Sequence, residues 1–403
     1  MKKLLLPLFI CAFLASDGRT QWKGDFFRPP AAFGVHDASL FGSMKGGHLY
    51  RYAPSTPDKW VFADTGIRPT FADKMVRAFG SVGQFLYVGG GGVYRSSDNG
   101  SNWTLSNKYL SGGEITAFDT IGTNLFAAAG GTFGYGIFRS IDSGVHWVEK
   151  DSGAIANVSF LVALQTSLFA ATTGGVFRSI DSGNSWKPTT VKDGVLTFCV
   201  IGSIILAGRA DGGVYRSTDN GDTWNYMGAS VLAKNYVPAL VTYGKYVLAG
   251  TEGGGIFLST DSGVTWDTTN MNTGLRSTVV HTLCVFDTFL IAGTDDPVYP
   301  DGNSYIRPLS EMLRKSGVKS VAAVPVRDTL EIYPNPASGL ITIHGSYSIE
   351  RVSVLNVLGA EVLNMLNNRA SELTLDLSHF ASGTYFLRIH SANGTVMRKV
   401  VRE

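Results

Sequence analysis

Carboxylates recur along this sequence in a fixed pattern, and regularly spaced acids can form turns, bind metals or transfer protons. The pattern is an octet, S-x-D-x-G-x-x-W, and it occurs five times. In each octet the Asp carboxylate can accept backbone N–H groups across a turn, and the Gly can adopt a positive φ angle. We therefore expect a structural role for the Asp and Trp of every octet: Asp98, Trp103, Asp142, Trp147, Asp181, Trp186, Asp219, Trp224, Asp261 and Trp266.

Polar side chains outside the repeating pattern are better candidates for a binding site. They fall in segments that either enter the innermost strand of a repeat or join its second and third strands, so they should share one face. Arginine and aromatic side chains on one face favour a groove for a glycan or a peptide. The alternative is that these segments are variable solvated loops. The candidate ligand-binding residues are Arg68, Tyr109, Tyr135, Arg209, Tyr236 and Arg276.

The sequence contains no evident catalytic constellation. A sialidase-type site needs an arginine cluster for the substrate carboxylate, a Tyr nucleophile with a carboxylate partner, and an acid. One Arg recurs beside each of four octets (Arg95, Arg139, Arg178 and Arg216), which predicts structural roles instead. If the chain is a hydrolase, Asp211 is a candidate carboxylate on the open face.

Metal and cofactor motifs are also not recognised. Asp295, Asp296 and Asp301 lack the spacing of a calcium-binding loop, and the seven His residues form no H-E-x-x-H pair. We expect no metal and no cofactor.

The octets define a repeat. Successive octet Trp residues are separated by 44, 39, 38 and 42 positions, which is about the length of one four-stranded propeller blade. The series resembles the Asp-box (BNR-repeat) β-propeller superfamily, which includes sialidases, sortilin-type receptors, xyloglucan-degrading hydrolases and photosystem II assembly factors. The resemblance implies an all-β fold and says less about activity.

Degenerate units flank the five clear repeats and predict a propeller over residues 37–326 with seven blades, six being the alternative. The first unit shows no innermost strand in its sequence, whereas residues 318–324 are typical of an unpaired strand after the last unit. We therefore expect residues 318–324 to complete the first blade and close the ring, which would remove free sheet edges.

The N-terminus is typical of a signal peptide. Lys2 and Lys3 precede an apolar run over residues 4–15, which is too short to span a bilayer as a mature helix. We expect a signal peptide over residues 1–18, an N-terminal segment over residues 19–36, and no transmembrane span in the mature chain.

Two cysteines then remain, Cys199 and Cys284. They occupy equivalent positions of two non-neighbouring units, too far apart for a disulfide. We expect both to be buried free thiols in inner strands.

The sequence changes character over residues 327–403, where octets and Trp stop and alternating apolar runs predict a small immunoglobulin-like β-sandwich. Four motifs resemble the type A C-terminal sorting domain of the type IX secretion system of Bacteroidota. The residues that carry this resemblance are Tyr333, Pro334, Asn335, Pro336, Asn356, Gly359, Gly383, Tyr385 and Lys399. The resemblance implies that type IX machinery is a partner and that the chain travels through the periplasm to the outer-membrane surface or the extracellular space.

Composition narrows the remaining function classes. The net charge is +2 and no basic cluster is interleaved with aromatics, so nucleic acid is not an expected partner. We expect a secreted or surface-displayed propeller that binds surface glycans or proteins without catalysis. The alternatives are a glycoside hydrolase of sialidase-like or xyloglucanase-like propeller type, and a structural envelope protein.

Overall fold

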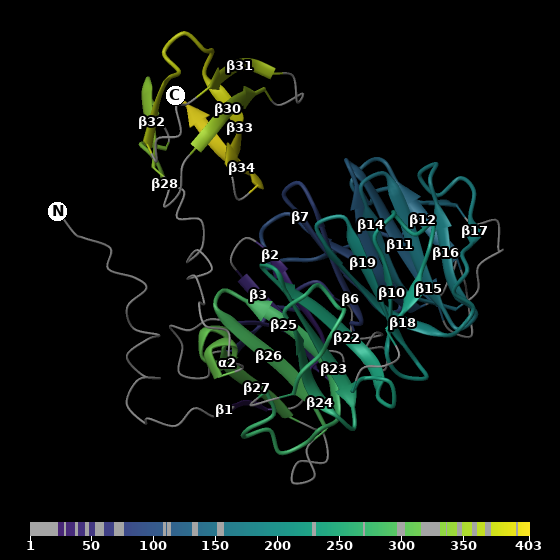
Figure 1. Ribbon diagram of the computed structural model, residues 1–403. Helices are drawn as coiled ribbons and strands as arrows, with labels where there is room; N and C mark the ends of the chain where they lie inside the picture. The colour runs from purple at the N-terminus through teal and green to yellow at the C-terminus, as the bar shows by residue number, and fades with distance from the viewer. Residues whose placement is uncertain are drawn as a thin grey trace. The chain divides into compact units, whose positions relative to one another are not determined.

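A computed structural model describes residues 23–27, 30–36, 39–44, 48–52, 60–67, 76–107, 110, 114–130, 136–150, 157–227, 231–268, 271–295, 303–315, 331–335, 337–344, 349–356, 361–366, 372–391 and 394–403. The chain divides into two units, Met1–Ser320 and Val321–Glu403, which are described separately below. Both units are built almost entirely of β-strands (Figure 1).

The described part of the first unit contains seven antiparallel sheets. Consecutive strands make up the first three: β2 (Pro30–His36), β3 (Ser39–Met44), β4 (Leu49–Tyr52), β5 (Trp60–Phe62); β6 (Ala78–Val82), β7 (Phe85–Gly89), β8 (Val93–Ser96), β9 (Thr104–Leu105); and β10 (Glu114–Ile121), β11 (Asn124–Gly130), β12 (Gly136–Ser140), β13 (Val148–Glu149).

The next three sheets repeat this order. They comprise β14 (Val158–Leu164), β15 (Ser167–Thr172), β16 (Gly175–Ser179), β17 (Lys187–Pro188); β18 (Val195–Ile201), β19 (Ile204–Arg209), β20 (Val214–Ser217), β21 (Asn225–Tyr226); and the three-stranded sheet of β22 (Tyr236–Tyr243), β23 (Tyr246–Glu252) and β24 (Gly255–Ser259). The seventh sheet contains β25 (Val280–Phe286), β26 (Phe289–Thr294), β27 (Asn303–Pro308) and β1 (Lys23–Phe27).

The first strands of the seven sheets form a closed ring. β2, β6, β10, β14, β18, β22 and β25 each contact the next in this order, and β25 contacts β2 again. The second strand of each sheet is covered on both faces by the adjacent sheets. β15, for example, is buried along its whole length. A strand covered on both faces needs a continuous apolar run rather than alternation, which explains sequences such as Ser-Leu-Phe-Ala-Ala-Thr in β15.

Closure of the ring differs from our expectation. β1 pairs with β27, with Lys23 opposite Ile306, so an N-terminal strand supplies the outer edge of the last sheet. The first sheet has its own inner strand, β2, so the expectation of a missing innermost strand there is wrong. Residues 23–27 and 30–36 thus belong to the sheets and not to a preceding segment, whereas residues 318–324 lie outside the described residues.

Close packing explains why β2 escaped notice in the sequence. A Cβ atom at Gly34 would lie 2.3 Å from the ring of Phe79 on β6, so this strand carries a glycine there and its apolar alternation is interrupted.

A short helix, α2 (Leu309–Lys315), was not predicted. Its Leu309, Met312 and Leu313 are fully buried, at the i, i+3, i+4 spacing of one helix face. Glu311 accepts a hydrogen bond at 3.1 Å from Arg307, a fully buried arginine at the end of β27. The helix therefore packs against the last sheet of the ring.

The second unit consists of two antiparallel sheets. One contains β28 (Glu331–Tyr333), β29 (Leu340–His344) and β32 (Glu372–Asp376); the other contains β31 (Glu361–Leu366), β30 (Ile349–Leu355), β33 (Gly383–Ser391) and β34 (Gly394–Arg402). Both sheets contribute to one apolar core, with Ile341, Ile343 and Leu375 from the first and Val352 and Leu387 from the second.

Candidate functional site

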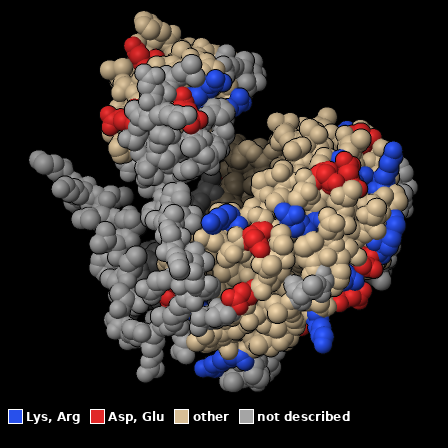
Figure 2. All heavy atoms as spheres, in the orientation of Figure 1, with Lys and Arg blue, Asp and Glu red and all other residues tan. Residues whose placement is uncertain are grey.

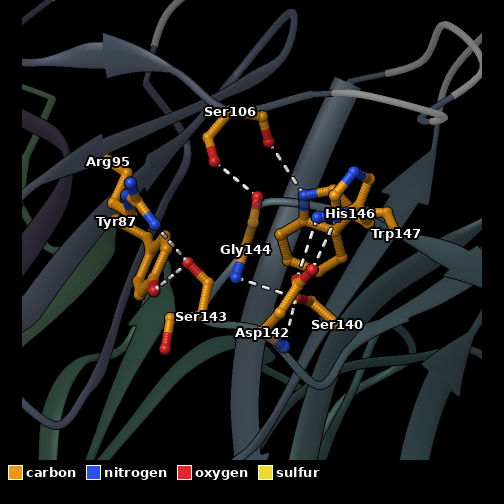
Figure 3. A network of polar contacts seen from close by, with 9 residues as sticks. All are labelled: Tyr87, Arg95, Ser106, Ser140, Asp142, Ser143, Gly144, His146 and Trp147. Atoms are coloured by element: carbon orange, nitrogen blue, oxygen red, sulfur yellow. Dashed lines mark hydrogen bonds and ion pairs between the residues drawn. The ribbon is translucent and has the colours of Figure 1, made fainter.

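The five octets adopt one geometry, which Figure 3 shows for the third sheet. Ser140 donates to the Asp142 carboxylate and accepts from the Gly144 amide, both at 2.8 Å. Asp142 also accepts the His146 amide at 2.9 Å. Ser143 and Gly144 have φ angles of 56° and 80°, so the turn needs two consecutive left-handed residues, the second of them a glycine. The octets are therefore self-contained turns that follow the third strand of their sheets.

Each octet is also joined to the preceding sheet. The Trp147 indole N–H donates to the Ser106 carbonyl at 2.8 Å, and Arg95 donates to the Ser143 carbonyl at 3.0 Å (Figure 3). Arg139 and Arg216 make the corresponding bonds to Ser182 and Ser262. These arginines link sheets and do not form a cluster that could bind a substrate carboxylate.

The octet hydrogen bonds predict a loss of stability in acid. Side-chain and main-chain bonds from Asn102 lower the pKa of Asp98, and those from Thr223 lower the pKa of Asp219, each from 3.8 to about 2. A carboxyl group whose pKa is lower in the folded than in the unfolded state stabilises the fold at pH values above its unfolded-state pKa. The stability that Asp98 and Asp219 contribute should therefore be lost as the pH falls from about 4 to about 2. Melting temperatures across that range should fall less steeply for the Asp98→Asn, Asp219→Asn double variant than for Glu149→Gln, a change at an exposed carboxylate. Parallel pH curves for the two would contradict this assignment.

The other end of the ring opens into a cavity of about 540 Å³. In a four-stranded antiparallel sheet, the start of the first strand lies at the end opposite the turn between strands three and four, so this mouth faces away from the octets. All seven first strands line it. Phe33, Phe79, Phe118, Leu240 and Leu283 give its wall an apolar character.

Bulges near the start of the first strands direct polar side chains into the mouth. The register of β10, β14 and β25 shifts by one residue around Thr116, Ser159 and His281, and these three residues line the cavity. The Thr116 hydroxyl donates to the Val158 carbonyl at 2.7 Å, and the Ser159 hydroxyl donates to the Val195 carbonyl at 2.9 Å. These two hydroxyls fasten neighbouring first strands together.

Charged groups at the mouth remain partly exposed. His281 lies between Glu252 and Asp295, at 3.2 Å and 3.1 Å from their carboxylate oxygens. Arg77 is paired with Glu114 at 3.0 Å and is 45% exposed. We define Arg77, Glu114, Glu252, His281 and Asp295 as the mouth cluster. It combines charge of both signs above an apolar wall, an arrangement suited to holding a ligand with polar and apolar parts.

The structure places the predicted binding residues in different surroundings. Tyr236 is 37% exposed and lies opposite Glu252 in the pairing of β22 and β23, beside the mouth cluster. Burial and the Glu252 charge raise its pKa. Arg276 is exposed in the segment that leads into β25. Arg68, Tyr109 and Tyr135 lie outside the described residues.

Arg209 is engaged within the fold. Its guanidinium carbon lies 4.6 Å from the centre of the Tyr226 ring and 5.3 Å from that of Tyr215, and it is paired with Asp193 at 3.1 Å. Asp211, the candidate hydrolase carboxylate, is 74% exposed at 3.8 Å from Arg209. We therefore assign Arg209 to joining two loops rather than to ligand contact.

Four members of the mouth cluster were not among the residues predicted from the sequence: Arg77, Glu114, Glu252 and His281. The available signal was a polar residue near the start of a first strand, which recurs in four of the units as Arg77, Thr116, Ser159 and His281.

The cysteine expectation is confirmed. Cys199 on β18 and Cys284 on β25 are buried free thiols, and burial raises the pKa of each to about 12. Neither thiol is therefore a ready nucleophile.

Sorting-motif residues in the second unit hold its two chain ends together. The Asn335 side chain accepts the Val401 amide at 2.9 Å, and the Ala337 amide donates to the Val401 carbonyl at 2.9 Å. Tyr385 donates to the Ala381 carbonyl at 2.9 Å. Gly383 begins β33, Asn356 follows β30 and Lys399 lies on β34, with Tyr333 and Pro334 exposed; Pro336 and Gly359 lie outside the described residues.

Over the described residues, no group of three or more His, Cys, Asp or Glu side chains is arranged to hold a metal ion. No helix in the same ranges is long and apolar enough to cross a membrane. On the face seen in Figure 2, Lys and Arg are interspersed with Asp and Glu rather than gathered into a patch of one sign.

Comparison with known proteins defines the class of both units. Residues 331–403 match the family model of a secretion system C-terminal sorting domain. No curated protein matches the chain. The ring of sheets has β-propeller structures as its neighbours, so the chain combines an all-β propeller-type fold with a type IX sorting domain.

Three solved structures illustrate the likeness. The extracellular domain of BT4673 from B. thetaiotaomicron has a TM-score of 0.57 at 11% identity, over 93% of this chain and 51% of its own; the present chain thus spans about half of that protein. YCF48 bound to D1 peptide has a TM-score of 0.55 at 13% identity, over 73% and 97%. The GH74 enzyme of Niastella koreensis has a TM-score of 0.53 at 14% identity, over 94% and 67%.

The sorting domain identifies the destination of the chain. It marks a protein that type IX secretion machinery exports to the cell surface or the extracellular space.

Proposed function

We propose that this chain is a non-catalytic binding protein, displayed on the cell surface or secreted, which holds a glycan or a protein segment at the mouth of its central channel. In this proposal the first unit is a seven-bladed Asp-box (BNR-repeat) propeller, the second is an immunoglobulin-like sandwich that acts as the sorting signal, and residues 1–18 are a signal peptide. Seven sheets in a closed ring, five octets of one geometry and the hydroxyl of Tyr385 bonded four residues upstream support these assignments.

The cavity at the channel mouth carries the proposal. It has about the volume of a small-molecule or side-chain pocket, and it joins an apolar wall to the charged mouth cluster. The structural likeness to YCF48 bound to D1 peptide favours a peptide as one candidate ligand.

A glycoside hydrolase is the second candidate, because a GH74 enzyme is among the structural neighbours. Such an enzyme needs an acid and a second carboxylate on either side of the scissile bond. Glu114, Glu252 and Asp295 each lie against a cationic or histidine side chain, which favours binding over acid–base chemistry.

A binding test separates the two candidates. His281→Ala and Arg77→Ala should each weaken retention of surface glycans or proteins by about 1–4 kcal/mol if they are hot spots, with little change in melting temperature. Thr218→Ala, an exposed change in an octet, is the matched control and should bind normally. Consumption of a glycan panel that Asp211→Asn abolishes would favour the hydrolase instead.

A further inference from the structure

The outer edge of the first sheet carries a pair of aromatic side chains at the surface. Tyr50 on β4 lies opposite Phe62 on β5, with ring centres 4.7 Å apart and an angle of 32° between the ring planes. Phe62 is 65% exposed, so most of its ring meets solvent. We call Tyr50 and Phe62 the outer pair. It is separate from the channel mouth, since neither residue lines that cavity.

Other sheets place different residues at the position of Phe62. In the second to fifth sheets an aromatic residue of the third strand also lies opposite one residue of the fourth strand. The fourth-strand residues are Leu105, Glu149, Pro188 and Tyr226, in sheet order. Of these four sheets, only the fifth has an aromatic residue there, so it provides an internal comparison for the outer pair.

The aromatic pair of the fifth sheet holds a cation. The guanidinium carbon of Arg209 lies 4.6 Å from the centre of the Tyr226 ring and 5.3 Å from that of Tyr215. Asp193 pairs with the same guanidinium at 3.1 Å, and the Arg209 side chain is only 12% exposed. Aromatic ring faces attract cations, and the attraction is stronger where water is excluded. The fold therefore already contains one guanidinium site made of two rings and a carboxylate.

The first sheet supplies the same two kinds of group. Asp64 follows Phe62 by two residues, and its side chain is 29% exposed. Its Oδ2 atom lies 2.9 Å from His48 Nδ1, and among the described residues its Oδ1 atom has no further contact. His48, at the position of Gly213 in the fifth sheet, packs edge-on against Phe62 with ring centres 5.4 Å apart. A carboxylate oxygen is thus available beside the exposed ring.

The chain does not fill this site with an arginine of its own. Arg51, the next residue after Tyr50 on β4, donates to the Asn99 carbonyl of the second sheet at 3.5 Å. Over the ranges that the structure describes, no Lys or Arg side chain stacks on Phe62, in contrast to Arg209 on Tyr226. The exposed face of Phe62 is therefore open to a cation from another molecule.

We propose that the outer pair binds the guanidinium group of an arginine side chain from a partner protein, with the guanidinium stacked on Phe62 and paired with Asp64. A planar guanidinium can stack on a ring and bond to a carboxylate at its edge at the same time, whereas an ammonium group cannot stack. Aromatic and arginine side chains are also enriched where proteins contact one another. This site is additional to the channel mouth and does not depend on it.

The experiment uses the mature chain labelled with nitrogen-15 and four soluble probes at millimolar concentrations and constant ionic strength: N-acetylarginine amide, N-acetyllysine amide, N-acetylglutamine amide and methyl β-glucoside. Binding is followed by NMR from the amide shifts of Phe62 and Asp64. We expect the arginine probe to bind about fivefold or more tightly than the neutral glutamine probe, and the lysine probe to bind more weakly than the arginine probe.

Two variants test the two parts of the site. Phe62→Leu removes the ring and Asp64→Asn removes the charge, and each should weaken binding of the arginine probe about fivefold or more. Glu149→Gln, at the position of Phe62 in the third sheet, is the matched control and should bind normally. Melting curves of the three variants establish that the fold is intact.

Each other outcome decides against the outer pair. An arginine probe that leaves the shifts of Phe62 and Asp64 unchanged would overturn the proposal. Equal binding of the lysine or glutamine probe, or tighter binding of the glucoside, would also overturn it, because the site would then not select a guanidinium group. Binding that Asp64→Asn leaves unchanged and His281→Ala abolishes would overturn it while supporting the channel mouth, so the two proposals can fail separately.

Discussion

Replacing Trp147 with Ala should lower the free energy of unfolding by about 3–5 kcal/mol, the range for deleting a large buried aromatic side chain. Trp147 is 1% exposed and packs near Phe118 of the same sheet, with ring centres 6.5 Å apart. Its indole also donates to the Ser106 carbonyl, so the variant would leave a cavity and an unpaired carbonyl at the boundary of two sheets.

The octet acid provides the comparison. Asp142→Ala removes turn hydrogen bonds at a half-exposed position and should cost about 1–3 kcal/mol. Urea unfolding of both variants measures the difference. A Trp147→Ala variant as stable as wild type, or less affected than Asp142→Ala, would show that the octet Trp does not hold the sheets together.

Features of the fold that depend on particular side chains close together in the sequence could be predicted. The octet needs Ser, Asp, Gly and Trp at fixed positions because each serves a separate bond or backbone angle, so the repeat stays visible. The buried free thiols of Cys199 and Cys284 followed from the same register.

The closure of the ring could not be predicted in this way. Pairing of β1 with β27 joins residues about 280 positions apart and depends on backbone bonds that any residue except proline can make. The inner strand β2 carries Gly34 against Phe79, which hides its alternation. Helix α2 is one short amphipathic segment whose stability comes from packing and from the buried Arg307.

The binding candidates show a similar division. Tyr236, one of the non-repeating candidates, lies beside the mouth cluster, whereas Arg209 is stacked on two Tyr rings. Spacing alone cannot distinguish an arginine that is free to meet a ligand from one that is already paired. Within the mouth cluster, His281 lies at a bulge in β25, which redirects its side chain without changing the apolar pattern around it.

Removing residues 331–403 should abolish surface display and leave a folded protein in the periplasm. The sorting domain lies wholly in the deleted part. The ring is closed by β1 and the last described element of the first unit is α2, so every described sheet of that unit remains in the shortened chain. Expressed in a bacterium with a type IX system, full-length protein should be digested by protease added to whole cells, whereas the shortened protein should be protected until the outer membrane is opened.

Arg77→Ala in the full chain is the matched control and should be exported normally. A melting transition of the purified shortened protein close to that of the full chain confirms that it folds. Protease-accessible shortened protein on intact cells would contradict the sorting role of the second unit.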